Sequence, residues 1–170
     1  DAQQFERWFA FGVMLPFASG HTAVGNVQKE PWAFGAEVEE TARQALNNRY
    51  RLLPYYYTLF YDAHTTGMPI AQPAFFADPS DPALRTEDDI FLIGEGLLIK
   101  PKLTLHGDRV PVMPKGIWNP LSLEGADNPD MPEFYLKGGT IIPSGPVMQH
   151  TMEKPLDPLT LIVALDENGL

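Results

Sequence analysis

Residues 35–67, GAEVEETARQALNNRYRLLPYYYTLFYDAHTTG, contain the pattern that decides the fold. Apolar and aromatic residues recur there at steps of three and four, which places them on one stripe of an α-helix. Gly67 and Pro69 predict where the helix ends, because glycine takes the left-handed cap and proline cannot continue the hydrogen-bond ladder. Pro54 lies inside the pattern and removes one hydrogen bond, so we expect a kink near Leu53 within a single long helix.

The chain before this helix predicts one repeating unit of an α/β fold. Residues 2–14 have helical spacing, Met14–Ala18 is a short apolar run that fits a buried parallel strand, and Ser19–Phe34 is a loop. Helix, strand, loop and helix form the repeat of an α/β barrel or a doubly wound sheet. In both folds the loop after the strand carries the site, so functional residues are expected before residue 35.

The chain after Gly67 changes to short apolar runs separated by Gly, Pro, Asn and Asp, which is typical of a small antiparallel sandwich. The runs are Ile70–Phe76, Ile90–Ile93, Leu97–Lys100, Arg109–Met113, Glu133–Leu136, Thr140–Ile142 and Leu159–Leu165. We therefore predict an α/β part over residues 1–67 and an all-β part over residues 68–170.

Composition excludes several classes of protein. The chain of 170 residues carries a formal charge of −10, which argues against binding to nucleic acid or to anionic membranes. It has no run of apolar residues long enough for a membrane span and no cysteine. Phosphate-binding glycine loops, nucleophile elbows and His-Glu-x-x-His are also missing from the sequence, so we expect no cofactor.

Both ends of the sequence look cut. The first residues already follow helical spacing, with a stripe that we expect to pack in the core: Phe5, Trp8, Phe9 and Val13. Asn168-Gly169 follows the last predicted strand and predicts a type I′ hairpin turn, but only Leu170 remains for the returning strand. We therefore predict an internal fragment of a longer protein, and we expect the isolated chain to aggregate through its unpaired edges.

His21 is the candidate binding residue. It lies among small residues beyond the predicted strand, where a neutral imidazole can donate one hydrogen bond and accept another, as a sugar hydroxyl requires. The equally weighted alternative is a loop histidine satisfied by backbone groups. The remaining histidines show no ligand spacing, so no metal site is expected: His64, His106 and His150.

The other charged residues are interpreted as structural. The acidic residues between Asp78 and Asp89 lack the spacing of a calcium loop and are broken by prolines, which favours a solvated linker. Arg49 and Arg51 are expected to lie along the helix surface or to pair with carboxylates.

Motifs along nearly the whole chain resemble the α-glucosidases of glycoside hydrolase family 31. In chain order they are Arg7-Trp8-Phe9, Pro16-Phe17, His21-Thr22-Ala23, Glu30-Pro31-Trp32-Ala33-Phe34-Gly35, Arg49-Tyr50-Arg51-Leu52-Leu53-Pro54-Tyr55, Tyr57-Thr58-Leu59-Phe60-Tyr61, Ala63-His64, Gly67, Asp89-Ile90-Phe91, Gly94-Glu95-Gly96-Leu97-Leu98-Ile99, Gly138-Gly139-Thr140-Ile141-Ile142-Pro143 and Pro155-Leu156-Asp157-Pro158-Leu159. The arginine–tyrosine helix motif is the most specific of them.

The resemblance implies a fold and a role. Residues 2–66 resemble the last helix–strand–helix part of a (β/α)8 barrel, and residues from 69 onward resemble the proximal C-terminal β-sandwich. His21 matches the family histidine at the end of the eighth strand, which hydrogen-bonds the sugar in the −1 subsite. The implied partners are an α-glucoside oligosaccharide and the rest of the barrel.

The resemblance also implies what the chain does not contain. The family mechanism is retaining and needs two aspartates roughly 5 Å apart across the scissile bond. In the family both come from earlier barrel strands, so no catalytic residue is assigned here and the isolated chain is expected to be inactive.

One motif departs from the family pattern. Family α-glucosidases commonly read Phe-aromatic-Arg-Asn-His-Ser, whereas residues 17–22 read Phe-Ala-Ser-Gly-His-Thr, which leaves the substrate linkage open. Glu30-Pro31-Trp32 favours an α-glucosidase over an α-xylosidase. A transglucosidase or a lyase acting on the same bond stays open, as does a non-catalytic carbohydrate-binding module with a stacking platform of Trp118, Phe134 and Tyr135. For this platform, core packing in strands is the commoner alternative.

Overall fold

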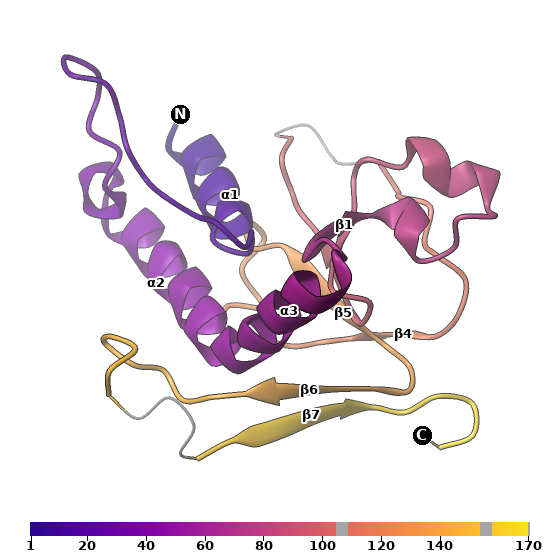
Figure 1. Cartoon of the computed structure of the whole chain (residues 1–170). Coiled ribbons are helices and arrows are strands. Elements are labelled where there is room, and N and C mark those ends of the chain that lie inside the picture. The colour runs from indigo at the N-terminus through magenta and orange to yellow at the C-terminus, as the bar shows by residue number, and fades with distance from the viewer. Residues whose placement is uncertain (105–108, 154–157, 170) are drawn as a thin grey trace.

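The computed structural model describes residues 1–104, 109–153 and 158–169, in which three α-helices are followed by antiparallel sheets (Figure 1). The α-helices are α1 (Ala2–Gly12), α2 (Ala36–Arg51) and α3 (Leu53–Thr66). Short 3-10 helices are η1 (Pro31–Phe34), η2 (Ala74–Phe76) and η3 (Pro82–Thr86). The strands are β1 (Ala71–Pro73), β2 (Phe91–Ile93), β3 (Leu97–Lys100), β4 (Trp118–Pro120), β5 (Glu133–Lys137), β6 (Thr140–Ser144) and β7 (Thr160–Ala164). The predicted order, a part with helices followed by an antiparallel β part, is confirmed.

The stretch from Gly35 to Gly67 forms two helices, so the prediction of one kinked helix was wrong. Leu52 has φ −87° and ψ −1° and separates α2 from α3, which meet at an angle in Figure 1. Pro54 lies in the first turn of α3, where its missing N–H is not needed, so proline here starts a helix. The predicted end is confirmed, because Gly67 caps α3 in the left-handed conformation with φ 78°.

The predicted buried strand over residues 14–18 is not formed. Residues 13–17 make turns and bends, and residues 17–30 are exposed and form a loop that extends from the body of the molecule (Figure 1). A strand is defined by ladder hydrogen bonds. The carbonyl groups of this segment bind side chains of α2 and α3 instead, as described below.

The β half contains a five-stranded sheet in the order β1-β2-β3-β5-β4 and a separate β6–β7 pair, all antiparallel. Six of the seven predicted runs contain a strand. The run Arg109–Met113 does not, because the Val112 N–H donates to the Glu87 carboxylate at 2.7 Å and not to a ladder. Strand β4 was not among the predicted runs. Its three residues include Asn119 and Pro120 and show no alternation of apolar and polar residues.

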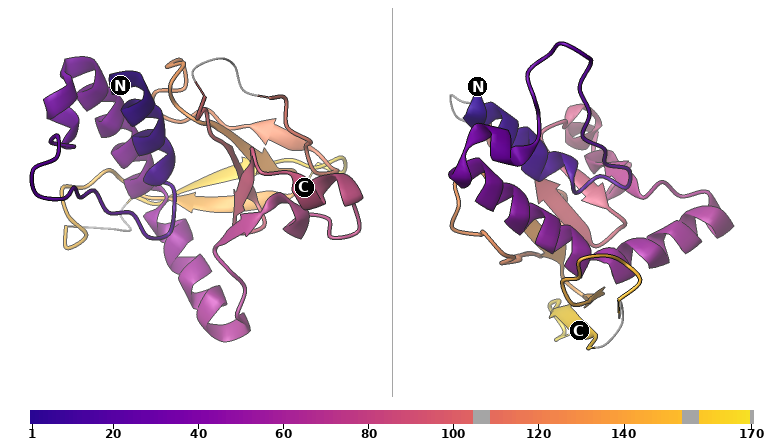
Figure 2. Two further views of the ribbon diagram at one scale, coloured as in Figure 1. Left: turned by 90° about the horizontal axis from the view of Figure 1, so that it is seen from above. Right: turned by 90° about the vertical axis from the view of Figure 1, so that its left-hand side faces the viewer.

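The central strands are apolar throughout because the five-stranded sheet is covered on both faces. Leu97 and Ile99 of β3 belong to a core that includes residues of α1, α2 and α3, whereas Leu98 packs with residues of η2 and η3. Figure 2 shows the α-helices and the segment with η2 and η3 on different sides of the sheet. The larger core contains residues from both sides of Gly67, so helices and sheets share one packed interior.

The chain ends beyond β7 in a turn that differs from the predicted type I′. The Gly169 N–H donates to the Asp166 carbonyl at 3.2 Å, and of the turn residues only Gly169 has positive φ, at 87°. A type I′ turn needs positive φ at both central residues. Leu170, the expected start of a returning strand, lies outside the described residues. Within the described ranges no helix has the length and apolar character to cross a membrane.

Candidate functional site

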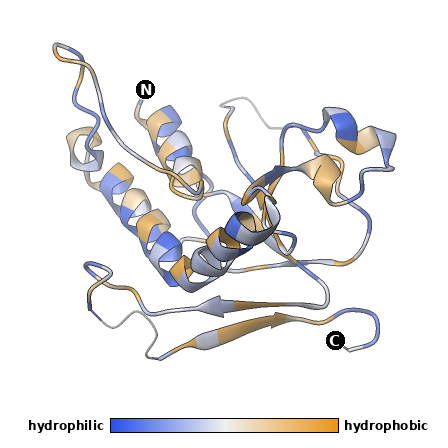
Figure 3. Cartoon of the chain, viewed as in Figure 1, coloured by the Kyte–Doolittle hydropathy of each residue, from blue (hydrophilic) through white to orange (hydrophobic). Residues whose placement is uncertain are grey.

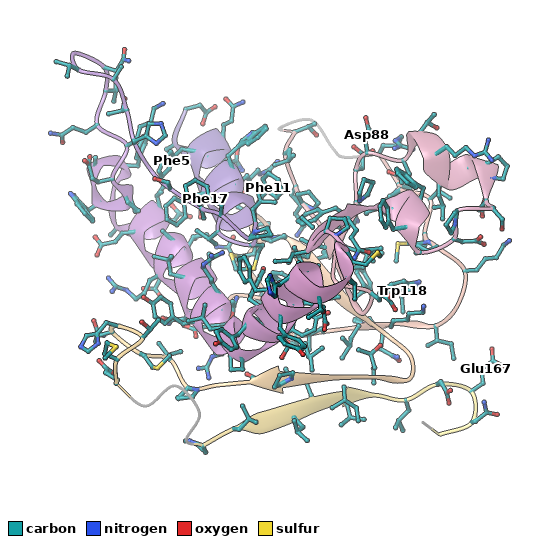
Figure 4. The ribbon with its side chains drawn as sticks, in the orientation of Figure 1. Phe5, Phe11, Phe17, Asp88, Trp118 and Glu167 are labelled. Atoms are coloured by element: carbon teal, nitrogen blue, oxygen red, sulfur yellow. The ribbon has the colours of Figure 1, made fainter. Side chains whose placement is uncertain are left out.

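A groove lies between α1, α2 and the loop that carries His21. Its volume is about 620 Å³. The lining residues are Phe5, Trp8, Phe9, Gly12, Val13, Leu15, Phe17, Ala18, Ser19, Gly20, His21, Lys29, Leu46, Arg49 and Tyr50. Figure 4 shows Phe5 on α1 and Phe17 on the segment that follows this helix. The loop histidine predicted from sequence therefore lies at a hollow of the surface.

The aromatic stripe of α1 only partly packs as predicted. Val13 is buried and Phe9 contacts the core, but Trp8 is 50% exposed and lines the groove. Phe17 is 85% exposed on the opposite, loop side of the groove. Exposed aromatic faces beside an imidazole suit a sugar ring, which offers both C–H surfaces and hydroxyl groups.

The backbone before His21 is held by side chains of the two long helices. Arg49 Nη1 donates to the carbonyl oxygens of Val13 at 2.5 Å and Leu15 at 2.6 Å, and Arg49 Nη2 donates to that of Pro16 at 3.1 Å. The Tyr56 hydroxyl donates to the Met14 carbonyl. Arg49 was expected to lie on the helix surface or to pair with a carboxylate; it binds backbone carbonyls instead.

The chemistry of Tyr56 keeps it a hydrogen-bond donor. Burial raises the pKa of Tyr56 above its ordinary value, and the neighbouring positive charge of Arg49 offsets only part of that rise. The guanidinium carbon of Arg49 also lies 5.4 Å from the Tyr56 ring centroid, within the range of a cation–π contact. The phenol therefore stays protonated at neutral pH and binds the Met14 carbonyl.

The groove offers binding groups but no carboxylate. Neither Asp nor Glu occurs among its lining residues, whereas glycoside hydrolysis with retention needs a pair of carboxyl groups. Within the described chain, the groove presents an imidazole and aromatic side chains and has no carboxyl group among its lining residues.

His64 and His150 do not line the groove. His64 is exposed in the last turn of α3, and His150 is exposed with its Nε2 3.9 Å from the Glu153 carboxylate. His106 lies outside the described residues.

The acidic stretch was predicted to be a solvated linker, and this was wrong for Glu87. Its side chain is fully buried and accepts hydrogen bonds from the Val112 N–H at 2.7 Å and from Arg109 at 2.9 Å. Burial alone would raise the pKa of Glu87, but these donors and the Asp89 N–H hold it below the ordinary value. Arg109 also pairs with Asp88 and Asp89. The three neighbouring carboxylates of Glu87, Asp88 and Asp89 therefore share one guanidinium as their positive partner.

The three aromatic residues considered as a stacking platform do not form an exposed surface. Phe134 is buried in the larger core, and Trp118 and Tyr135 pack against the smaller one. The Trp118 indole donates to the Pro114 carbonyl at 3.0 Å, and the Tyr135 hydroxyl donates to Glu133 at 2.7 Å. Core packing, the commoner alternative, holds.

The resemblance noted in the sequence assigns the helices to the end of an α/β barrel and the sheets to the C-terminal β domain of glycoside hydrolase family 31. Comparison with known families gives the same assignment. Residues 1–59 match the TIM-barrel domain of glycosyl hydrolases family 31, and residues 67–142 match the C-terminal domain of that family. The chain belongs to glycoside hydrolase family 31.

Individual relatives support this assignment. An α-glucosidase of Hordeum vulgare is 37% identical over 177 residues, covering 96% of this chain and 20% of the relative. The crystal structure of a family 31 α-glucosidase from Bacteroides thetaiotaomicron has a TM-score of 0.88 and 48% identity over 98% of this chain and 27% of its own. A family 31 dextranase of Flavobacterium johnsoniae, complexed with glucose, has a TM-score of 0.86 and 30% identity over 97% and 22% of the two chains.

The chain spans 18–19% of the length of the first curated relatives it matches. Family membership establishes a glycoside hydrolase at the level of the family. The substrate and the activity of the whole protein belong to the proposal that follows.

Proposed function

We propose that this chain is the end of the catalytic barrel and the adjoining β domain of a longer retaining α-glucosidase, which releases terminal α-linked glucose from oligosaccharides. The observation that carries the proposal is His21. This histidine matches the sugar-binding histidine of the family, and it is exposed at a groove lined by Trp8 and Phe17. The similar dextranase is complexed with glucose, which supports a glucose-binding enzyme.

The two catalytic aspartates lie outside this chain. The groove at His21 contains no carboxylate. Elsewhere, Glu87 and Asp130 are committed to structural pairs with Arg109 and Arg7. The isolated chain is therefore inactive, and His21 is its contribution to the active site.

Product analysis of the full-length protein tests this function. Incubation with an aryl α-glucoside should yield glucose as the α-anomer at the earliest times in a proton NMR spectrum, because a double displacement retains configuration. Chromatography separates the alternatives within the family: oligosaccharides longer than the substrate indicate a transglucosidase, and an unsaturated or anhydro sugar indicates a lyase. Faster turnover of an aryl α-xyloside than of the matching α-glucoside indicates an α-xylosidase.

A second measurement tests whether the catalytic aspartates lie in the part of the protein upstream of this chain. Sequencing about 300 codons upstream, the length that the missing barrel requires, should show the catalytic aspartates. The isolated chain should show no turnover of the same substrates. Turnover by the isolated chain would contradict the proposal.

A further inference from the structure

The segment before His21 is fastened through four consecutive carbonyl groups. Those of Val13, Leu15 and Pro16 accept from Arg49, and that of Met14 accepts from Tyr56. Val13 is 6% exposed and Met14 is fully buried, so these carbonyls need partners from the protein. The segment forms no strand ladder, and the two side chains provide those partners.

Arginine is suited to this task. Its guanidinium is a planar group with donors in fixed directions, and one such group here serves three carbonyl oxygens. A lysine at the same place keeps the charge but is a point charge on a flexible stem and cannot reproduce that arrangement. Hydrogen bonds from a charged donor are also stronger than neutral ones.

The bond to the Pro16 carbonyl is the last fixed point before His21. In the described part of the chain no hydrogen bond involves residues 17–22. Among these residues, only His21 has a long side chain with a hydrogen-bond donor. Residues 18–20 are Ala, Ser and Gly, where related α-glucosidases carry an aromatic residue, Arg and Asn. Arg49 therefore holds the point at which the loop that leads to His21 begins.

The bend between α2 and α3 brings both donors to one segment. Arg49 lies in the last turn of α2 and Tyr56 in the first turns of α3, on either side of Leu52. Their carbonyl partners follow one another along the chain. The bend between α2 and α3 therefore places both side chains where they bind the segment that borders the groove.

We propose that Arg49, supported by Tyr56, is the positioning residue that sets the place of His21 at the groove. This inference rests on the proposed function, because it assigns a role to Arg49 through a histidine that binds substrate. Arg49 also lines the groove, but its guanidinium donates to three backbone carbonyls, and in this account its effect on turnover passes through His21.

The test uses the full-length protein with Arg49→Lys, His21→Ala and the double variant, and measures kcat and KM on an aryl α-glucoside. Small misplacements of a contacting group can cost up to about 100-fold, so Arg49→Lys should lower kcat/KM by about 10-fold or more. In the His21→Ala background the same change should have less than about twofold effect, because the positioned group is gone. The matched control is Arg51→Lys, since Arg51 is 43% exposed and pairs only with Glu124 at 3.8 Å.

A second readout reports the segment without relying on turnover. The N–H groups of Val13, Met14 and Leu15 are hydrogen-bonded in the last turn of α1, and hydrogen exchange of a peptide that covers them reports their protection. Arg49→Lys should speed this exchange, and Arg51→Lys should not.

The outcomes separate this inference from the function on which it rests. If His21→Ala leaves kcat/KM unchanged, the proposed role of His21 fails, whatever Arg49 does. If His21→Ala lowers kcat/KM but Arg49→Lys lowers it equally in both backgrounds, or leaves exchange unchanged, the positioning role of Arg49 is overturned while the function stands.

Discussion

The side-chain amide of Asn48 pairs with the backbone of Glu124 in both directions. Its Nδ2 donates to the Glu124 carbonyl at 2.8 Å, and its Oδ1 accepts from the Glu124 N–H at 3.0 Å. Asn48 is fully buried. Its side chain gives the N–H and the carbonyl of Glu124 the two hydrogen bonds that a neighbouring strand would otherwise provide. This pair fixes α2, which also carries Arg49, against the loop between β4 and β5.

Replacing Asn48 should therefore destabilise the protein more than replacing its neighbour. Asn48→Ala leaves two partly buried backbone groups of Glu124 without their side-chain partner, which should cost roughly 2–4 kcal/mol. Asn47 is only half-buried and donates to the Glu124 carboxylate at 2.9 Å, so Asn47→Ala should cost about 0.5–1.5 kcal/mol. Thermal unfolding of the two full-length variants measures the difference. Equal melting temperatures would show that the Asn48 hydrogen bonds stabilise the protein no more than that of Asn47.

Gly94, between β2 and β3, lies directly against side chains of α3. A Cβ there would lie 2.6 Å from the Tyr55 hydroxyl and 2.7 Å from a Leu59 methyl group, and φ is +62°. Gly94→Ala should cost about 2–4 kcal/mol from overpacking and backbone strain together. Gly67→Ala is the control, because its φ of +78° is also unfavourable but no atom lies within 4 Å, which leaves strain alone at about 1–2 kcal/mol. A Gly94 variant that melts no lower than the Gly67 variant would contradict the close packing.

Glu87 should make the stability of the protein depend on pH on the acid side. Its pKa is lower in the folded protein than in the unfolded chain, where a glutamate has a pKa of about 4.3. The stabilisation is therefore present above that pH and is lost as the pH falls through the folded value. Glu87→Gln should flatten the acid limb of melting temperature against pH.

The control for this effect is Asp88→Asn. The Asp88 side chain is 89% exposed and lies 3.5 Å from the same guanidinium, so its removal should leave the acid limb nearly unchanged. If both variants have the same pH profile as the unmodified protein, the buried pair with Arg109 does not contribute.

The isolated chain should aggregate through β7. This strand pairs only with β6 in the described chain, and Figure 3 shows it as strongly hydrophobic. Leu161 is 59% exposed and Val163 is 45% exposed. An unpaired apolar edge strand invites association with other chains, so Leu161→Lys should delay aggregation in light scattering. A monodisperse, cooperatively melting 170-residue chain would contradict this expectation.

Local patterns predicted most of the fold. Helix α1, the cap at Gly67 and six strands follow from apolar periodicity and from turn residues, which act within a few positions of the chain. The division at Leu52 was missed although Pro54 signalled it, because proline allows either a kink or a new helix. Whether the helix continues depends on packing that periodicity does not report.

The hydrogen bonds that hold the segment beside the groove could not be predicted from such local patterns. Arg49 and Tyr56 bind carbonyl groups more than 30 residues away in the chain, and these bonds replace the expected strand over residues 14–18. The burial of Glu87 likewise depends on Arg109 and Val112, which are distant in sequence. The position of His21 on a loop was predicted, and its contact with sugar remains a prediction.

The most direct test of this account is the kcat/KM of His21→Ala in the full-length protein, measured with maltose and an aryl α-glucoside. Loss of one hydrogen bond to the sugar in the transition state should lower kcat/KM by about 1–3 kcal/mol, or roughly 5-fold to 150-fold, without changing the melting temperature. Unchanged kinetics with both substrates would show that His21 does not bind the reacting sugar.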